Sequence, residues 1–222
     1  MIAGAPRQLL IGVSMQIPVQ RYALLSQDPT LHRALIDLLA GLRPPTVGRV
    51  WRTGVCSWPI GRSGFVRGRL SGWQAVRMVA RLYGLDEDLC RWTVAETLSQ
   101  PELFDTRLDL WPPSARQELV CLVPLLPQFD IYIADGPLPV RRDRYTTLWR
   151  ALFAERVKGR MLVLSTSRLG EVSEHCDVAL VLEGGVLRIE TNLDDALLRY
   201  PLRLAPVEER RTVEGDDDAE FG

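Results

Sequence analysis

Residues 129–135 read Phe-Asp-Ile-Tyr-Ile-Ala-Asp, an apolar run that ends in a carboxylate. A short run of this kind, rich in β-branched and aromatic residues, predicts a buried strand. Tyr22-Ala-Leu-Leu25 and Met161-Leu-Val-Leu164 are similar compact apolar runs on either side of it in the chain. We therefore expect three buried strands, with Asp135 at the end of the second.

Helical periodicity fills the segments between these strands. Leucines at positions 31, 35, 38, 39 and 42 recur at helical spacing and predict a helix over 30–42. Further helices are expected over 73–83, 86–98, 114–126, 144–157 and 193–200. Strands that alternate with helices favour an α/β fold with a mostly parallel sheet. The helical stretch over 73–126 interrupts this alternation, which indicates an inserted helical subdomain.

Shorter β segments are expected near both ends of the fold. Apolar and polar residues alternate in the segment 7–25, which predicts two short strands around a turn and hence an N-terminal antiparallel β part. Gly48-Arg-Val-Trp51 predicts another strand, and residues 178–189 predict a hairpin. We expect a single domain over residues 1–200, followed by a disordered acidic tail over 201–222.

The composition excludes several classes of protein. The chain has 222 residues, of which 46% are hydrophobic and 25% are charged, and its formal net charge is −1. Without a net positive charge, binding to nucleic acid is not expected. No apolar run approaches the roughly 18 residues of a membrane-spanning helix, so we expect a soluble chain that meets a membrane only through a partner. The four cysteines and two histidines are scattered, so neither disulfides nor a metal site are expected.

Several short motifs follow one another in a recognisable order. They are Leu38-Leu-Ala-Gly-Leu42, Arg43-Pro-Pro-Thr-Val-Gly-Arg-Val50, Ser57-Trp-Pro59, Gly64-Phe65, Arg81-Leu-Tyr-Gly84, Asp130-Ile-Tyr-Ile-Ala-Asp135 and His175-Cys-Asp177 through Leu182-Glu-Gly-Gly185. In this order, residues 7–200 resemble the ATP-binding subunits of ABC transporters. Three of the motifs, at 57–59, 64–65 and 81–84, resemble most closely the subunits of capsular and related polysaccharide exporters. The resemblance implies an ABC-ATPase fold of the P-loop NTPase type.

The phosphate-binding loop that this resemblance implies is degenerate. Such a loop needs the pattern G-x-x-x-x-G-K-[ST], because its glycines allow close backbone approach and its lysine reaches the phosphates. The corresponding window, Ser26-Gln-Asp-Pro-Thr-Leu-His-Arg33, contains no glycine. Leu31 stands for the second glycine, His32 for the lysine and Arg33 for the hydroxyl that binds magnesium, and Asp28 adds a negative charge. We expect a loop that caps a helix rather than a phosphate site.

The other positions that the resemblance assigns to ATP chemistry are also altered, with one exception. Asp135 retains the magnesium-associated aspartate, but Gly136 replaces the glutamate that polarises the attacking water. Val66 stands for the glutamine that senses magnesium, and Ser167 for the histidine that contacts the γ-phosphate. In the signature segment, Ser114 remains; we predict that it is a helix N-cap first and a phosphate contact second.

The resemblance also assigns one segment to contact with a membrane subunit. Its residues are Trp58, Gly64, Phe65, Val66 and Arg67. The alternative is a loop that is simply anchored by buried aromatic residues.

Three functions remain open from the sequence. The first is a non-hydrolysing structural or regulatory subunit of a polysaccharide-export ABC transporter, located in the cytoplasm and held at the membrane by a permease. The second is an asymmetric partner of an active ATP-binding subunit, which would contribute Ser114 to one composite ATP site. The third is a stand-alone binding module that reuses the fold. No ATP, magnesium or other cofactor is expected, and the chain is predicted to be inactive in ATP hydrolysis on its own. It could form a homodimer or a heterodimer.

Overall fold

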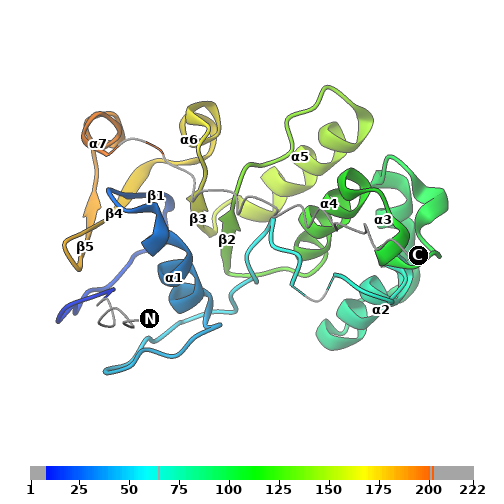
Figure 1. The fold of residues 1–222 in the computed structure, drawn as a ribbon, viewed down its shortest axis with the longest axis horizontal. Coiled ribbons are helices and arrows are strands. Elements are labelled where there is room, and N and C mark those ends of the chain that lie inside the picture. Colours follow the sequence, from blue (N-terminus) through cyan, green and yellow to red (C-terminus); the bar gives the residue numbers. More distant parts are fainter. Residues whose placement is uncertain (1–8, 65, 201, 203–222) are drawn as a thin grey trace, which may run out of the picture.

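The structure is a computed structural model that describes residues 9–64, 66–200 and 202. Its centre is a five-stranded sheet formed by β1 (Arg21–Ser26), β2 (Ile131–Asp135), β3 (Met161–Ser165), β4 (Val178–Glu183) and β5 (Val186–Glu190) (Figure 1). The strand order is β2-β3-β1-β4-β5. All neighbouring strands are parallel except β4 and β5, which form an antiparallel hairpin. The predicted α/β class with a mostly parallel sheet is confirmed.

Helices alternate with the strands and also gather beyond one edge of the sheet. They are α1 (Pro29–Ala40), α2 (Gly72–Tyr83), α3 (Glu87–Thr97), α4 (Pro113–Leu122), α5 (Arg144–Val157), α6 (Leu169–His175) and α7 (Leu193–Arg199), with 3₁₀ turns at Pro101–Leu103, Leu108–Leu110 and Val123–Leu125. In Figure 1, α2, α3 and α4 lie at the end of the molecule beyond β2, on the opposite side from β5. The sheet therefore has a helical body at its β2 edge.

The two faces of the sheet are buried in two separate cores. Successive side chains of a strand point to opposite faces. In β1, Tyr22 and Leu24 belong to the core that includes Leu35 and Ile36 of α1. Ala23 and Leu25 belong to the larger core, which includes buried residues of α4, α5, α6 and α7. Burial on both faces explains why the strand reads as a continuous apolar run.

Side-chain caps fix where several helices begin. Ser71 and Gln74 form a reciprocal capping box at the start of α2, and Gly84 ends this helix with φ = 65°. Asp86 caps α3 and Asp143 caps α5, each by accepting a backbone N–H bond. These caps place the helix starts within one residue of the positions that the sequence pattern predicts.

The predicted N-terminal antiparallel β part is wrong for residues 9–20, which form no strand. Leu9, Val13 and Ile17 are partly buried against the α1 core, and the N–H of Ile11 donates a 2.8 Å bond to the carbonyl of Gly185. The alternation therefore does not mark a paired strand, since Ile11 and Met15 of the same series are 55% and 37% exposed and only Leu9, Val13 and Ile17 pack on the core. Residues 7 and 8 lie outside the described part of the chain.

Three other expectations need correction or completion. Gly48-Arg-Val-Trp51 forms no strand, and Trp51 is 81% exposed, so this segment lacks a buried face. The helix expected over 114–126 ends at Leu122, because Pro124 lies in the following 3₁₀ turn. Helix α6 was not predicted, since Leu169 and Val172 are its only large apolar residues and show no helical period. Of the acidic tail, residues 201 and 203–222 lie outside the described part.

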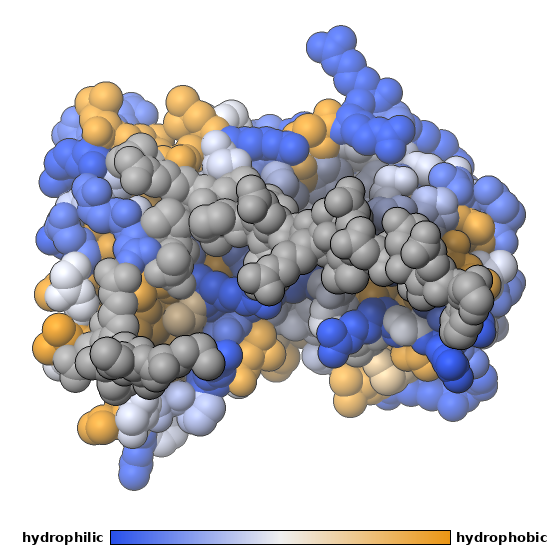
Figure 2. All heavy atoms as spheres, viewed as in Figure 1, coloured by the Kyte–Doolittle hydropathy of each residue, from blue (hydrophilic) through white to orange (hydrophobic). Residues whose placement is uncertain are grey.

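The molecular surface is mixed in character. On the face shown in Figure 2, hydrophobic residues occur in separate groups among hydrophilic ones. Among the described residues, no helix combines the length and the apolar character needed to cross a membrane.

Replacing Trp149 with Ala should strongly destabilise the protein. Trp149 is fully buried in the larger core, stacks on Phe153 with ring centroids 4.9 Å apart, and donates a 3.0 Å bond from Nε1 to the carbonyl of Cys121. We expect the free energy of unfolding in urea to fall by about 3–5 kcal/mol. The adjacent Leu148 is 37% exposed, so Leu148→Ala is the control and should cost less than about 1 kcal/mol. Equal losses for the two variants would contradict this description of the core.

Candidate functional site

The carboxyl ends of the parallel strands β1, β2 and β3 bring several of the predicted site residues to the same end of the sheet. Asp135 at the end of β2 lies opposite Ser165 at the end of β3. Strand β1, whose last residue is Ser26, pairs in parallel with β3 on its other side. In parallel α/β sheets, ligands bind in the crevice outside these carboxyl ends. This edge is therefore the place to test the expected ATP site.

The turn from β1 to α1 is very short. Only Gln27 and Asp28 separate the strand from the helix. Ser26 Oγ accepts a 3.0 Å bond from the N–H of Asp28 and donates a 3.1 Å bond to its carbonyl, and the N–H of Leu31 also donates to that carbonyl at 3.1 Å. The helix thus begins three residues before His32. Residues that would have to form an open anion cradle are already helical or bonded within the turn.

His32 is held inside the protein rather than presented to a ligand. The residue is 8% exposed, and its Nδ1 lies 3.1 Å from Ser165 Oγ. Burial lowers the pKa of His32, although Asp135 and Asp28 act in the opposite direction. Its Nε2 is buried and has no hydrogen-bond partner in the described part of the chain. A neutral, buried imidazole offers no positive charge to phosphate.

Asp135 is bound by an arginine from the same chain. Arg62 Nε donates to Asp135 Oδ2, and Arg62 Nη1 donates to Asp37 Oδ1 of α1. The side chains of Arg62, Asp37 and Asp135 are 17%, 12% and 22% exposed. Arg62 and Asp37 could not be predicted as site residues from local sequence patterns, because they lie 25 residues apart and pair only through the fold. We call these three residues the Arg62 triad.

Two glycines define the backbone around Asp135. Gly61 has φ = 94°, and a Cβ built there would lie only 2.9 Å from the carbonyl oxygen of Asp135. Gly136 has φ = 119°, and its N–H donates a 2.8 Å bond to the carbonyl of Ser165. A side chain at position 136 would meet no atom within 4 Å, but it would have to adopt this strained backbone conformation. The backbone at this position suits glycine rather than glutamate.

The residues at this edge do not fit a magnesium ion with a bound nucleotide. Magnesium requires several oxygen ligands in an octahedral arrangement, whereas the Asp135 carboxylate already accepts from a guanidinium. Among the described residues, no group of three or more His, Cys, Asp or Glu side chains could hold a metal ion. Arg33, on the first turns of α1, adds another positive charge nearby, and its carbonyl lies 3.5 Å from Arg62 Nη2.

Several named proteins are similar to this chain over most of its length. The capsule polysaccharide export ATP-binding protein CtrD of Neisseria meningitidis is 26% identical over 181 residues, which cover 82% of this chain and 84% of that protein. The ATP-binding protein BexA of Haemophilus influenzae is also 26% identical, with 82% and 83% covered, and the polysialic acid transport ATP-binding protein KpsT of Escherichia coli is 27% identical, with 79% and 80% covered. Over about four fifths of its length, this chain is therefore similar in sequence to ATP-binding proteins named for capsule polysaccharide export and polysialic acid transport.

Solved structures share the fold of this chain. A bacterial ABC transporter cassette solved as a dimer superposes with a TM-score of 0.59 at 16% identity, covering 82% of this chain and 90% of that one. The cbiO1 protein of Clostridium perfringens, part of an ABC transporter complex, gives 0.57 at 18% identity, covering 86% and 84%. No protein-family model matches the chain.

Three further predicted site positions lie away from the contacts at the carboxyl ends of β1, β2 and β3. Ser114 is exposed and is the second residue of α4, whose N-cap is Pro112, so the prediction that Ser114 caps the helix is wrong. Pro113 takes the first helical position because its fixed φ suits a helix start. Val66 is 1% exposed in the larger core, and Ser167 is exposed beyond the end of β3.

The segment predicted to meet a membrane subunit combines a buried anchor with an exposed loop. The ring centroid of Trp58 lies 5.8 Å from that of Phe129 and 6.2 Å from that of Tyr83. Gly64 and Arg67 are exposed, whereas Phe65 lies outside the described part of the chain. The aromatic contacts show that Trp58 is a packing residue. Contact between the exposed loop and a membrane subunit stays a prediction.

A groove of about 430 Å³ lies beside this anchor, and we call it the apolar groove after the apolar residues in its lining, which also includes polar side chains of Asp86, Thr93, Gln128 and Arg156. The large apolar residues of the lining are Tyr83 at the end of α2, Leu85, Leu89 of α3, Leu126 and Leu152. Leu89 is 59% exposed. Since Tyr83 also contacts Trp58, the groove adjoins the segment that carries the predicted membrane-subunit contacts.

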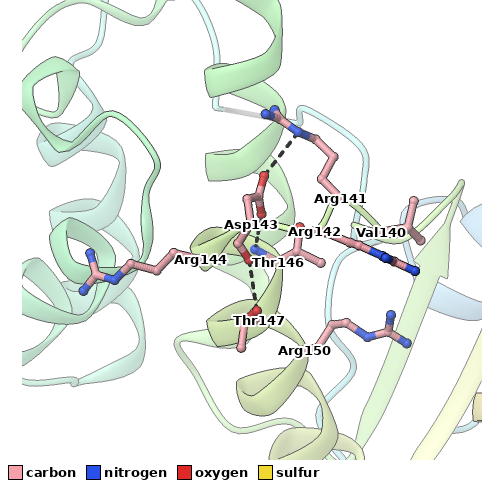
Figure 3. A pocket seen from close by; sticks show the side chains of 8 residues that line it. All are labelled: Val140, Arg141, Arg142, Asp143, Arg144, Thr146, Thr147 and Arg150. Carbon is pink, nitrogen blue, oxygen red and sulfur yellow. Dashed lines mark hydrogen bonds and ion pairs between the residues drawn. The ribbon is translucent and has the colours of Figure 1, made fainter.

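A second hollow, of about 590 Å³, lies at the start of α5 and is lined by arginines (Figure 3). Asp143 accepts a 2.8 Å bond from the N–H of Thr146, which lowers the pKa of its carboxyl, and pairs with Arg141 at 3.2 Å. Arg144 and Arg150 form ion pairs with Glu96 and Glu174. Much of the positive charge is therefore already paired, and the hollow lies in the segment after Asp135 rather than at the strand ends.

Buried His32 should make the protein less stable as the pH falls below about 6.5. Because its pKa is lower in the folded state, the unfolded chain takes up the proton first, and stability is lost as pH falls toward the folded-state pKa. One such group contributes a slope of at most about 1.4 kcal/mol per pH unit. We expect His32→Asn to flatten the dependence of the unfolding free energy on pH between 7.5 and 5.

The control for this experiment is His175→Asn. Burial also lowers the pKa of His175, so this variant should flatten the curve by a separate amount, and the double variant should be flattest. Identical slopes for the wild type and His32→Asn would show that His32 is not a buried neutral group.

Proposed function

We propose that this chain is a non-hydrolysing homologue of ABC ATP-binding subunits that serves as a structural or regulatory component of a polysaccharide-export transporter. The observation that carries the proposal is that the carboxyl ends of the strands are closed by contacts within the chain. Only two residues separate β1 from α1, and the Asp135 carboxylate already accepts a bond from Arg62. The export role is supported by the similarity to proteins named for capsule polysaccharide export and polysialic acid transport.

The chemistry of phosphoryl transfer has no evident agents here. Catalysis of this step consists almost entirely of positioning and of stabilising charge on the transferred group. His32 is a buried imidazole bonded to Ser165, and position 136 has no carboxylate. These losses concern the bound phosphates, the metal and the attacking water, so restoring any one of them leaves the others missing.

The proposed partner is a membrane permease, which would hold the chain at the cytoplasmic face of the membrane. The apolar groove beside Tyr83 and Leu89 supports this proposal, since it is a concave surface with an exposed leucine next to the Trp58 segment. A homodimer or a heterodimer with an active subunit is compatible with the fold, and one solved relative in fold is a dimer.

An asymmetric ATPase is the second candidate, and the exposed Ser114 near the start of α4 is the observation that favours it. Helix N-termini bind anions through their free N–H groups and dipole. At α4, however, Pro112 and Pro113 supply no N–H, so this helix start is a weaker anion site than an ordinary one. We therefore rank the non-hydrolysing role first.

Calorimetric titration with Mg-ATP should give no binding by the purified chain at concentrations up to about 1 mM. The reason is the absence of an anion cradle between β1 and α1. The variant His32→Lys/Gly136→Glu should still bind no ATP, because it restores two side chains but neither the glycines of the loop nor its open conformation. CtrD or BexA, treated identically, is the positive control. Micromolar binding or turnover by the wild-type chain would overturn the proposal.

Substitution in the apolar groove should weaken capture of the permease. Leu89→Glu places a charge in the groove, and we expect recovery of the chain with a co-expressed permease encoded next to it to fall at least about tenfold. Leu82→Glu is the matched control, because Leu82 is 73% exposed on α2 and does not line the groove. Both variants should keep wild-type thermal stability. Equal recovery of Leu89→Glu and the wild type would exclude the groove as the docking site.

A further inference from the structure

The Arg62 triad is the most buried ion-pair system in the described chain. It contains the only Arg–carboxylate pairs among the described residues in which both side chains are less than 25% exposed. The other pairs include at least one strongly exposed partner, as in Arg21–Asp177, where the side chains are 40% and 52% exposed. Burial to this degree makes each charge depend on its partner, because solvent compensates it poorly.

The triad joins three separate elements through one planar group. Asp135 ends β2, Asp37 lies in the middle of α1, and Arg62 lies in the loop between them in space. A third nitrogen, Arg62 Nη2, lies 3.5 Å from the carbonyl of Arg33. Guanidinium is always charged and presents donors in fixed directions, so it can bridge acceptors on different elements as a single point charge cannot.

The backbone before Arg62 delivers it to this place. The N–H of Ile60 donates a 2.8 Å bond to the carbonyl of Ile133, and the N–H of Asp135 donates a 2.9 Å bond to the carbonyl of Ile60. The segment therefore runs parallel to β2, with a bridge between Ile60 and Ala134. At Gly61 it approaches the carbonyl of Asp135 so closely that a side chain would not fit.

From this geometry we infer that Arg62 is a built-in cation that holds the loop 57–64 against the sheet, in place of the metal ion and nucleotide that the fold family implies. Two carboxylates from different elements need a positive charge between them, and in this chain the side chain of Arg62 provides that charge. The loop is consequently fixed in one position whether or not nucleotide is present. The inference rests on the proposed function and deepens it. If Arg62 holds the loop, the conformation of the surface next to Trp58 does not depend on binding or hydrolysis of ATP.

The test is hydrogen exchange of the segment 57–64, together with thermal unfolding, in Arg62 variants. In Arg62→Ala we expect amide exchange of this segment to rise at least about tenfold and the melting temperature to fall by roughly 5–10 °C. Arg62→Lys should lie between Ala and the wild type, since ammonium keeps the charge but not the bridging geometry. Adding Asp135→Asn to Arg62→Ala should recover part of the loss by removing an unpaired charge.

The matched control is Arg43→Ala. Arg43 Nε lies 3.5 Å from Asp37 Oδ2, but its side chain is 75% exposed, so its removal should change neither exchange nor melting temperature measurably. If Arg62→Ala does not fold, the Arg62→Lys and Asp135→Asn variants still report on the loop. Wild-type exchange of residues 57–64 in a folded Arg62→Ala would overturn the inference.

Magnesium and ATP separate this inference from the proposed function. We expect exchange of the segment 57–64 in the wild type to be unchanged by 10 mM magnesium with ATP. A magnesium-ATP-dependent change in that segment would overturn the inference. Calorimetric binding of ATP without such a change would contradict the proposed function and still support a loop held by Arg62.

Discussion

The central position of β1 is the constraint on which the rest of the structure depends. This strand pairs in parallel with β3 on one side and β4 on the other, and Tyr22–Leu25 are at most 1% exposed. A strand buried on both faces and bonded on both edges has one register that keeps its apolar residues inside. That register brings the end of β1 beside the end of β3, which carries Ser165 and lies between β1 and Asp135 of β2, and it decides where α1 starts.

At the carboxyl ends of these strands, several polar groups that a ligand would use are bonded within the chain, although His32 Nε2 is buried without a partner among the described residues. Ser26 closes the turn, His32 meets Ser165, and Asp135 meets Arg62. Each of these contacts meets the general requirement that buried polar groups find partners. A fold can therefore be kept intact while its chemistry is lost, because packing and catalysis make separate demands on the same residues.

Local sequence patterns predicted the elements but not the site. Apolar runs and helical periods located β1 to β3 and most helices, since burial on both faces and a 3.6-residue period leave direct marks in the sequence. The alternation over 9–17 did not correspond to a strand, because Ile11 and Met15 of the alternating series stay exposed and only Leu9, Val13 and Ile17 pack on the core. The pairing of Arg62 with Asp37 and Asp135 left no local mark, as it depends on residues 25 and 73 positions away.

The left-handed backbone at Gly136 limits which residues this position accepts. A single nucleotide change can convert a glycine codon into a glutamate codon. With φ = 119° and the N–H of Gly136 bonded to the carbonyl of Ser165, however, a side chain at this position is opposed by the backbone conformation. The gain of a carboxylate next to Asp135 is therefore simple genetically but costly structurally.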